Sequence, residues 1–502
     1  MRAPAVFTTK EIRLLEERAA RALGAGPTLM ERAGAATARA AADLLPPAGG
    51  PLLVVAGPGN NGGDAWVAAA RLREAFHRVI VHDATGRAPQ APEARAAATR
   101  FLELGGRTVP EWPAGLRPAV IVDGLFGIGL ARDVDGPLAA LVGRINASGA
   151  PVLAIDIPSG IDSDTGRVRG AAVRATRTLT FIARKPGLHT AEALDHTGEI
   201  DVDALGIPAA FFEGASGGLL TPEAVRGWLP RRPRHSHKGT FGTLAVVGGS
   251  RGMTGAALLA ARAGALAGAG KTFVHCLAPD ALAVDPSFPE LMIRPLDDSP
   301  GADAYVVGPG AGFHPLTPRI SPFERKVLPD LLAHRAPLVV DADAINAIST
   351  SDALKQSLAS RAAPTILTPH PAEAARLLGR STEAVQADRL AAALDLAKWF
   401  RAEVVLKGAG SVCASPDGTW SINTTGNPGL ASGGTGDVLA GIAGALLAQG
   451  LAAPAALRLA VCLHGAAADA CVARGAGPVG LTASEVALEA RAVLNRWVAA
   501  AD

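Results

Sequence analysis

The feature of this sequence that most constrains its fold is a unit that recurs along the chain: a short apolar run, a turn rich in glycine or polar residues, and a helical stretch. The first unit has the run P-L-L-V-V-A, the turn G-P-G-N-N-G-G-D at residues 57–64, and a helix predicted over 65–76. Such apolar runs are typical of strands buried in parallel sheets, and strands alternating with helices predict an α/β fold. Further strands are predicted at 78–82, 119–122, 152–155, 243–247, 304–307, 337–340, 365–368 and 403–406.

The length of the chain indicates more than one domain. Its 502 residues favour two or three domains. The stretch 211–220 is rich in glycine and lacks periodicity, which is typical of a domain boundary. We therefore expect two three-layer α/β/α domains, residues 1–212 and 221–502, the first of them Rossmann-like. Because 49% of the residues are hydrophobic and only 4% aromatic, Ala, Val, Leu and Ile are expected to fill both cores.

Charge and cysteine content limit the partners and the compartment. A net charge of +2 indicates no nucleic-acid partner, and the four cysteines lack metal-binding spacing, so we expect them reduced and buried. The N-terminus has no apolar signal core, and glycines interrupt the apolar run 438–457, which therefore predicts two buried helices rather than a membrane span. We expect a soluble, cytoplasmic protein. Only eight of the 48 basic residues are lysines, so a lysine in a glycine-rich loop is notable.

The turn at 57–64 contains the pattern G-x-G-x-x-G of dinucleotide-binding domains. Asp83 lies 21 residues after the last of these glycines, where an acid that binds a ribose would stand. One interpretation is therefore a nicotinamide-dependent dehydrogenase. The evidence against this interpretation is the presence of Asn60, Asn61 and Asp64. A pyrophosphate cradle does not require these side chains, and they have the character of ligands.

Polar residues follow three of the predicted strands of the first half. Asn61, Asp123, Asp156 and Ser159 all stand at carboxyl ends of strands, which meet at one edge of a parallel sheet. Oxygen ligands without Cys or His suit a hard cation, here a monovalent one rather than zinc. Each residue alone is more simply explained as a turn residue that satisfies loop backbone. For the four together we favour a site.

In the second half, the loop G-G-T-G at 433–436 leads into an apolar helix predicted over 438–447. Free amides at a helix N-terminus form an anion site. Asp437 beside it is either a helix cap or a general base next to a phosphate. Other predicted strands end in G-P-G-A-G, D-A-D-A-I-N, P-H-P-A-E and K-G-A-G-S, and no Walker A motif occurs.

The motifs of the first half, together with M-E-R-A-G at 30–34, closely resemble the NAD(P)H-hydrate epimerase domain over about residues 8–210. The resemblance implies K⁺ held by Asn61, Asp123 and Ser159. Ala65 stands where the family usually has Gly, and we expect helix packing to absorb the methyl group. The implied hydrate-binding residues are Asn60, Asn61, Gly62, Gly63, Asp64, Gly127, Ile128, Gly129, Leu130, Ala131, Arg132, Asp133 and Asp156.

The motifs of the second half resemble, in order, the ADP- or ATP-dependent NAD(P)H-hydrate dehydratase, which has a ribokinase-like fold, over residues 221–500. The resemblance implies Mg²⁺ with a nucleotide, ADP for a bacterial chain, and Ala372 replaces a usual Gly. The implied nucleotide-binding residues are Lys407, Gly408, Ala409, Gly410, Ser411 and Gly436. The implied hydrate-binding residues are Ala256, Gly310, His370 and Asp437.

The chemistry of a hydrated nicotinamide connects the two halves. Hydroxide is a poor leaving group, so phosphorylation of the ring hydroxyl, with Asp437 as base, precedes elimination of phosphate that restores NAD(P)H. A dehydratase for one epimer needs an epimerase, in which Asp156 is either a proton-transfer group or a ligand.

Two alternatives stay open: a small-molecule kinase fused to a dinucleotide-binding domain, and a first half that binds without catalysis. The substrates are the hydrates of NADH and NADPH, and the alanine-rich helices favour a homo-oligomer.

Overall fold

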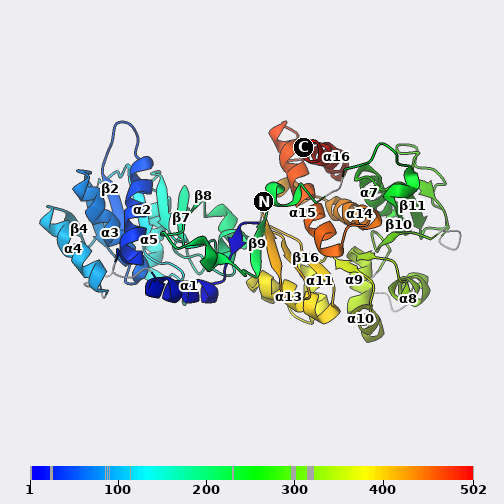
Figure 1. The fold of residues 1–502 in the computed structure, drawn as a ribbon, viewed down its shortest axis with the longest axis horizontal. Helices are drawn as coiled ribbons and strands as arrows, with labels where there is room; N and C mark the ends of the chain where they lie inside the picture. Colours follow the sequence, from blue (N-terminus) through cyan, green and yellow to red (C-terminus); the bar gives the residue numbers. More distant parts are fainter. Residues whose placement is uncertain are drawn as a thin grey trace. The chain divides into compact units, whose positions relative to one another are not determined.

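The computed structural model describes residues 3–22, 26–84, 86, 89, 91–113, 115–228, 231–295, 301–313 and 321–500. The chain divides into two compact units, Ala5–Ser216 and Gly217–Asp502, and Met1–Pro4 belong to the second. Figure 1 shows that each unit is a sheet covered by helices. Both units are mixed α/β with largely parallel sheets, so the predicted fold class is confirmed.

The first unit contains a parallel seven-stranded sheet of order β4-β3-β2-β5-β6-β7-β8. The direction of winding reverses between β2 and β5, and ligands of such sheets bind at the carboxyl ends of the strands at this point. Its elements are β1 (Ala5–Val6), α1 (Thr9–Ala22), α2 (Leu29–Asp43), β2 (Leu52–Ala56), α3 (Asn60–Glu74), β3 (Val79–Asp83), α4 (Pro92–Glu103), β4 (Arg107–Val109), β5 (Val120–Gly124), α5 (Gly136–Asn146), β6 (Val152–Ile155), β7 (Arg177–Phe181) and β8 (Glu199–Asp203).

The central strand β2 shows why this unit has three layers. All five of its residues are buried. Leu52 and Val54 belong to a core with residues of α1, α2 and α3, whereas Leu53 and Val55 belong to a second core with residues of α5. Because side chains alternate along a strand, a continuous apolar run supplies both faces of the sheet at once.

The second unit contains a sheet of order β9-β18-β17-β16-β15-β14-β13-β10-β11-β12, parallel except where β17 runs antiparallel to both neighbours. Its winding reverses between β10 and β13. Its strands are β9 (Gly217–Leu220), β10 (Thr243–Gly248), β11 (Lys271–Cys276), β12 (Met292–Ile293), β13 (Ala304–Val307), β14 (Leu338–Val340), β15 (Thr365–Leu367), β16 (Glu403–Leu406), β17 (Val412–Ala414) and β18 (Trp420–Asn423).

The helices of the second unit lie on both sides of its sheet (Figure 1). Helices α7, α14, α15 and α16 share one core with Leu244 and Val246 of β10. The helices are α6 (Pro222–Val225), α7 (Thr254–Leu266), α8 (Leu328–Ala333), α9 (Ala342–Ser349), α10 (Asp352–Ala359), α11 (Pro371–Leu378), α12 (Thr382–Ala387), α13 (Arg389–Phe400), α14 (Thr435–Ala448), α15 (Ala453–Ala473) and α16 (Ala483–Ala499).

The structure corrects three predictions. Helix α3 begins at Asn60 and α14 at Thr435, so Asn61 and Asp437 lie in first helical turns and Asp64 lies just after the first turn of α3, not in loops. The glycines in these two motifs made the sequence read as loop rather than helix. However, the first turn of a helix does not need an apolar face. The predicted linker contains a strand, β9, which pairs with β18. Gly217 lacks a side chain because a Cβ would lie 2.1 Å from the Trp420 ring. Cys276 is half-buried, not buried.

The apolar run at 438–457 forms the end of α14 and the start of α15, as predicted. Among the described residues, α15 is the one helix long and apolar enough to cross a membrane by length and composition. However, 67% of its most apolar window is buried inside the protein, which is typical of a core helix.

Candidate active sites

The first unit has a cavity of about 780 Å³ at the carboxyl ends of β2 and β5, where the winding of the sheet reverses. Residues of α1, α2, the start of α3 and the loops after β2, β5, β6 and β7 line it. Ten residues predicted to bind the hydrate line this cavity: Asn60, Asn61, Asp64, Gly127, Ile128, Gly129, Leu130, Ala131, Arg132 and Asp156.

Three other predicted residues do not line the cavity. Gly62 is a contact point between backbones, since a Cβ there would lie 1.9 Å from the carbonyl oxygen of Gly57. A Cβ at Gly63 would lie 2.5 Å from the Met30 side chain. The Asp133 carboxylate accepts a hydrogen bond from Arg169 Nε at 3.0 Å. Their assignment to hydrate binding stays a prediction.

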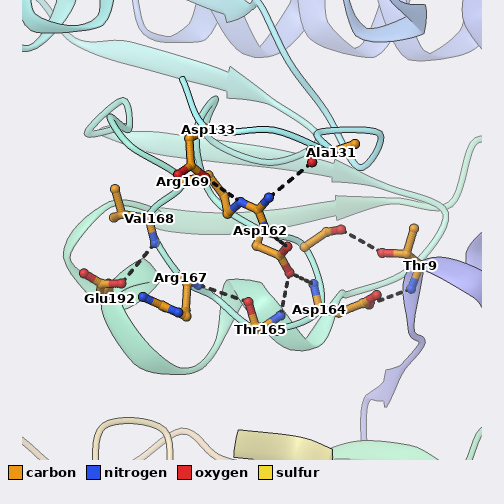
Figure 2. Close-up of polar contacts among 11 residues, drawn as sticks. Thr9, Ala131, Asp133, Asp162, Asp164, Thr165, Arg167, Val168, Arg169 and Glu192 are labelled. Atoms are coloured by element: carbon orange, nitrogen blue, oxygen red, sulfur yellow. Dashed lines mark hydrogen bonds and ion pairs between the residues drawn. The ribbon is translucent and has the colours of Figure 1, made fainter. Parts of the chain in front are cut away.

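Figure 2 shows the polar contacts that connect the loop 162–169 to Thr9 and to the segment 131–133. Asp164 accepts a hydrogen bond from the Thr9 amide at 2.7 Å, at the start of α1. On the other side, Arg169 donates to Asp133 and to the Ala131 carbonyl oxygen at 3.2 Å. This loop thus fixes the position of α1 and of the segment after β5, both of which line the cavity.

The three residues predicted to hold K⁺ come together at the backbone of Phe126. Asn61 Nδ2 donates to the Phe126 carbonyl oxygen at 2.9 Å. Ser159 Oγ donates to Asp123 Oδ1 at 2.6 Å and accepts from the Phe126 amide at 2.8 Å. A Cβ on Gly127 would lie 3.2 Å from the Asn61 side chain, so Gly127 keeps this corner open.

The charge of Asp123 favours a cation here. Its side chain is fully buried. Burial raises the pKa of this carboxyl, and hydrogen bonds from Ser159 and Leu125 oppose the effect. No described lysine or arginine pairs with it. Carboxylate, hydroxyl, amide and carbonyl oxygens in one place match the ligands that hard cations prefer, so the residues fit K⁺.

The sequence did not predict four charged residues that line this cavity: Arg13, Glu16, Glu17 and Lys185. Glu16 reaches it from α1, and Lys185 reaches it from the loop after β7. Lys185 is buried and forms an ion pair with Asp156. The rarity of lysine was the one available signal for Lys185. Nothing in the amphipathic pattern of α1 distinguished Glu16 from a solvent-exposed glutamate.

In the second unit, Asp437 lies in the first turn of α14, whose N-cap is Gly434 with φ +90°. Asp437 is therefore not the N-cap residue. No described residue donates a hydrogen bond to its carboxylate in the structure. Burial, and then the negative charge of Asp341, raise the pKa of Asp437 to about 7, although Lys407 opposes them. A carboxyl with this pKa can accept a proton near neutral pH.

Lys407 lies close to other residues that the sequence predicts to form the site of the second unit. It follows β16, and its Nζ donates to Asp341 Oδ1 at 3.0 Å. The same Nζ lies 3.2 Å from where a Gly436 Cβ would stand, beside the start of α14. Burial lowers the pKa of Lys407, but the charges of Asp341, Glu373 and Asp437 together raise it above its usual value. An ammonium group thus stands next to free helix amides, which suits a phosphate.

His370 is the N-cap of α11. Its Nδ1 accepts hydrogen bonds from the amides of Ala372 and Glu373, and the Glu373 carboxylate accepts from the His370 amide at 2.8 Å. Burial and the nearby Lys407 lower the pKa of His370 to about 4, and burial raises that of Glu373 to about 7. His370 is therefore neutral, and its Nε2 lies 3.3 Å from Glu373 Oε1.

The other predicted residues lie around the carboxyl ends of β10, β13 and β16. A Cβ at Gly310 would lie 3.0 Å from Ala256 Cβ, so these two predicted hydrate-binding residues are neighbours. The segment that follows Lys407 contains Gly408, Ala409, Gly410 and Ser411, and Ser411 Oγ donates to the Gly408 carbonyl oxygen at 2.9 Å. Glycine is required at 408, where φ is +135°.

Comparisons with known proteins cover both units. A family model described as NAD(P)H-hydrate dehydratase matches residues 244–488, and one described as YjeF-related protein N-terminus matches residues 26–187. A crystal structure of the ADP/ATP-dependent NAD(P)H-hydrate dehydratase of Bacillus subtilis, co-crystallized with ATP/Mg²⁺, is similar with a TM-score of 0.48 and 32% identity. The alignment covers 56% of this chain and 98% of the Bacillus subtilis chain.

Three curated relatives are each named bifunctional NAD(P)H-hydrate repair enzyme Nnr. The protein of Coxiella burnetii is 37% identical and the alignment covers 98% of this chain and 99% of that one. The Escherichia coli protein is 36% identical, and the alignment covers 98% of this chain and 94% of that one. The Gloeobacter violaceus protein is 42% identical, and the alignment covers 89% of each chain. The chain therefore belongs to the family of bifunctional NAD(P)H-hydrate repair enzymes, which unite an epimerase and a nucleotide-dependent dehydratase.

Proposed function

We propose that Asp437 is the general base of the dehydratase. The observation that carries this proposal is a half-buried carboxylate, to which no residue in the described part of the chain donates a hydrogen bond, at the N-terminal turn of α14 and with a pKa of about 7. Asp437 takes the proton of the ring hydroxyl as the oxygen attacks the terminal phosphoryl group of the nucleotide. The amides of Gly433–Gly436 and the Lys407 ammonium group stabilise the negative charge on that group.

The second step needs less from the protein. The lone pair of the ring nitrogen expels phosphate, and the double bond of NAD(P)H forms again. His370, Ala256 and Gly310 orient the hydrate. Mg²⁺ would enter with the nucleotide and supply positive charge for its phosphates, whose oxygens are donors that this ion prefers.

For the epimerase we propose that Asn61, Asp123 and Ser159 hold K⁺ through oxygen atoms, with the carbonyl oxygen of Phe126. The buried Asp123 carboxylate, which has no cationic partner among the residues that the structure describes, supports this assignment. When bound there, K⁺ would supply positive charge beside the loop after β5. Asp156, at the end of β6, transfers the proton that inversion at the ring carbon requires.

The test of the dehydratase assignment uses the S epimer of the hydrate with Mg²⁺ and either ADP or ATP. We expect recovery of absorbance at the reduced-nicotinamide wavelength with the wild type. Asp437→Asn should recover it about 10²–10⁴-fold more slowly, the range for loss of a general base. An Asp437→Asn rate within threefold of the wild type contradicts the assignment.

The K⁺ assignment is tested by dialysis against Li⁺ or tetramethylammonium salts. Epimerisation without nucleotide should slow and return when KCl is added, and Asp123→Asn should abolish the response. Equal rates in all three salts contradict the proposal.

The same assays separate the alternatives. A stable phosphorylated product without recovery of NADH indicates a small-molecule kinase. Recovery limited to the S fraction of a mixture indicates that the first unit binds without catalysis. The homo-oligomer and the cytoplasmic location stay predictions, which sedimentation and fractionation of cells test.

A further inference from the structure

The cavity of the first unit contains more ionisable groups than its proposed function uses. Its charged side chains come from separate elements, and the question is which carboxyl group acts on the substrate. These side chains are Arg13, Glu16 and Glu17 of α1, Asp64 of α3, Arg132 after β5, Asp156 after β6 and Lys185 after β7.

All three N–H donors of the Lys185 ammonium group bind groups of the protein itself. Its side chain is 1% exposed. The Nζ atom donates to Asp156 Oδ1, to Thr180 Oγ1 at 2.8 Å and to the Phe181 carbonyl oxygen at 2.8 Å. An ammonium group has three N–H donors, so none is left for a substrate. Lys185 therefore acts on the reaction through Asp156.

The two oxygens of Asp156 have different surroundings. Oδ1 accepts from Lys185, from Thr180 Oγ1 at 3.2 Å and from the Phe181 amide at 3.1 Å. No described residue donates a hydrogen bond to Oδ2. Asp156 also has φ +65°, an uncommon conformation for a residue with a side chain, which the hydrogen bonds maintain. The carboxylate is thus held by one oxygen, and the other is free to face the cavity.

The other two carboxyl groups that approach Asp156 lack this support. Neither Glu16 nor Asp64 forms an ion pair with a described cation. Burial first, and then the negative charge of Asp156, raise the pKa of both, and that of Asp64 well above its usual range. Among the three, Asp156 is the one whose negative charge an ammonium group stabilises directly.

We propose that Lys185 is the positioning residue of the epimerase: it fixes Oδ1 of Asp156 and stabilises the carboxylate, so that Oδ2 takes and returns the substrate proton. This inference rests on the proposed role of Asp156 in epimerisation.

In the proposed epimerisation, the proton transfer opens the nicotinamide ring of the substrate. The O–H bond of the substrate hydroxyl breaks, and Oδ2 takes the proton. The electron pair left on oxygen forms the carbonyl bond as the bond from the ring carbon to nitrogen breaks. Nitrogen keeps that pair and takes a proton from water, and the hydroxide left behind takes the proton from Oδ2, so the carboxylate is restored. Closure on the opposite face of the carbonyl runs the same transfers in reverse and gives the other epimer.

The test uses the full chain without nucleotide, so that the dehydratase is idle, and follows conversion of the R to the S hydrate by chromatography. Lys185→Met should lower kcat at least about 10²-fold at neutral pH, with KM changed less than threefold. The kcat of Lys185→Gln, which keeps a hydrogen-bond donor without the charge, should fall by a similar factor. Lys185→Arg should recover part of the rate. Lys10→Met, the same change at an exposed lysine of α1, should match the wild type.

A pH profile distinguishes positioning from a structural role. Without the ammonium group the carboxylate takes a proton more readily, so the acid limb of kcat should move to higher pH in Lys185→Gln. The dehydratase rate of the same chain on the S hydrate checks that each variant is folded. A Lys185→Gln enzyme with unchanged kcat, or with a lower kcat and an unshifted profile, overturns the inference. A wild type that does not exceed spontaneous epimerisation overturns the proposed function instead.

Discussion

At the scale of the residue, both sites depend on carboxyl groups that the protein places out of water. Asp437 is the clearest case, because burial and the neighbouring Asp341 keep it protonated below pH 7. A base must be ionised to accept a proton. We therefore expect kcat/KM of the dehydratase for the S hydrate to rise with pH up to about 7 and then to level off.

The matched comparison for this profile is the epimerase activity of the same chain, in which Asp437 takes no part. Measured between pH 5 and 9, it should not change in Asp437→Asn. A dehydratase profile that is flat from pH 5 to 8 contradicts the role of Asp437.

Asp64 provides a second prediction at this scale. Its pKa is raised in the folded protein by burial, Asp156 and Glu16, whereas in the unfolded chain it ionises near pH 4. Above that pH the unfolded state binds fewer protons than the folded state, so this carboxyl lowers the free energy of unfolding as the pH rises. Asp64→Asn should therefore raise Tm by a few degrees at pH 8 and leave it nearly unchanged at pH 4, where about 2–4 °C corresponds to 1 kcal/mol.

Calorimetry of the full chain checks this prediction, with Asp43→Asn as the control because Asp43 is exposed. A Tm that falls at pH 8 in Asp64→Asn contradicts it. The same variant should lose epimerase activity, since Asp64 lines the cavity.

How much the sequence predicts at this scale depends on where the residues stand. Asn61, Asp123 and Ser159 follow strands of one sheet, and strand order brings them together, as expected. Lys185 and Glu16 could not be found in the same way. Glu16 lies 140 residues from Asp156, and only the packing of α1 against the sheet brings it into the cavity.

At the scale of the element, the glycines of α14 explain how its N-terminus is positioned. A Cβ at Gly441 would lie 1.9 Å from the carbonyl oxygen of Ala260 in α7. The two helices therefore touch through backbone. Gly441→Ala should separate them, lower the free energy of unfolding by about 1–3 kcal/mol and reduce dehydratase activity, because Asp437 is on the same helix.

Gly255→Ala is the control on α7, since nothing lies within 4 Å of a Cβ there and alanine favours a helix. Thermal unfolding of the two variants should differ by several degrees. Equal transitions would mean that backbone contact does not hold α14 in place.

Strands were easier to predict than helix starts. The predicted strands at 304–307 and 403–406 coincide with β13 and β16, because short buried runs that are apolar except for Glu403 leave few alternatives. Helices α3 and α14 start earlier than predicted, within glycine-rich motifs. Gly62 and Gly441 are there for contact with neighbouring backbone, which a helical pattern does not reveal.

At the scale of the whole molecule, each compact unit has its own sheet, its own switch point and its own set of carboxyl groups. The two activities should therefore be separable by single substitutions. Asp156→Asn should leave dehydration of the S hydrate within twofold of the wild type and remove epimerisation, and Asp437→Asn should do the reverse.

The most direct measurement is recovery of reduced-nicotinamide absorbance from a mixture of both hydrate epimers with K⁺, Mg²⁺ and either ADP or ATP. The expected result is recovery beyond the S fraction, faster than spontaneous epimerisation. Asp156→Asn should recover only the S fraction at the early rate, and Asp437→Asn should recover absorbance about 10²–10⁴-fold more slowly than the wild type. No recovery by the wild type with either nucleotide would contradict the repair function itself.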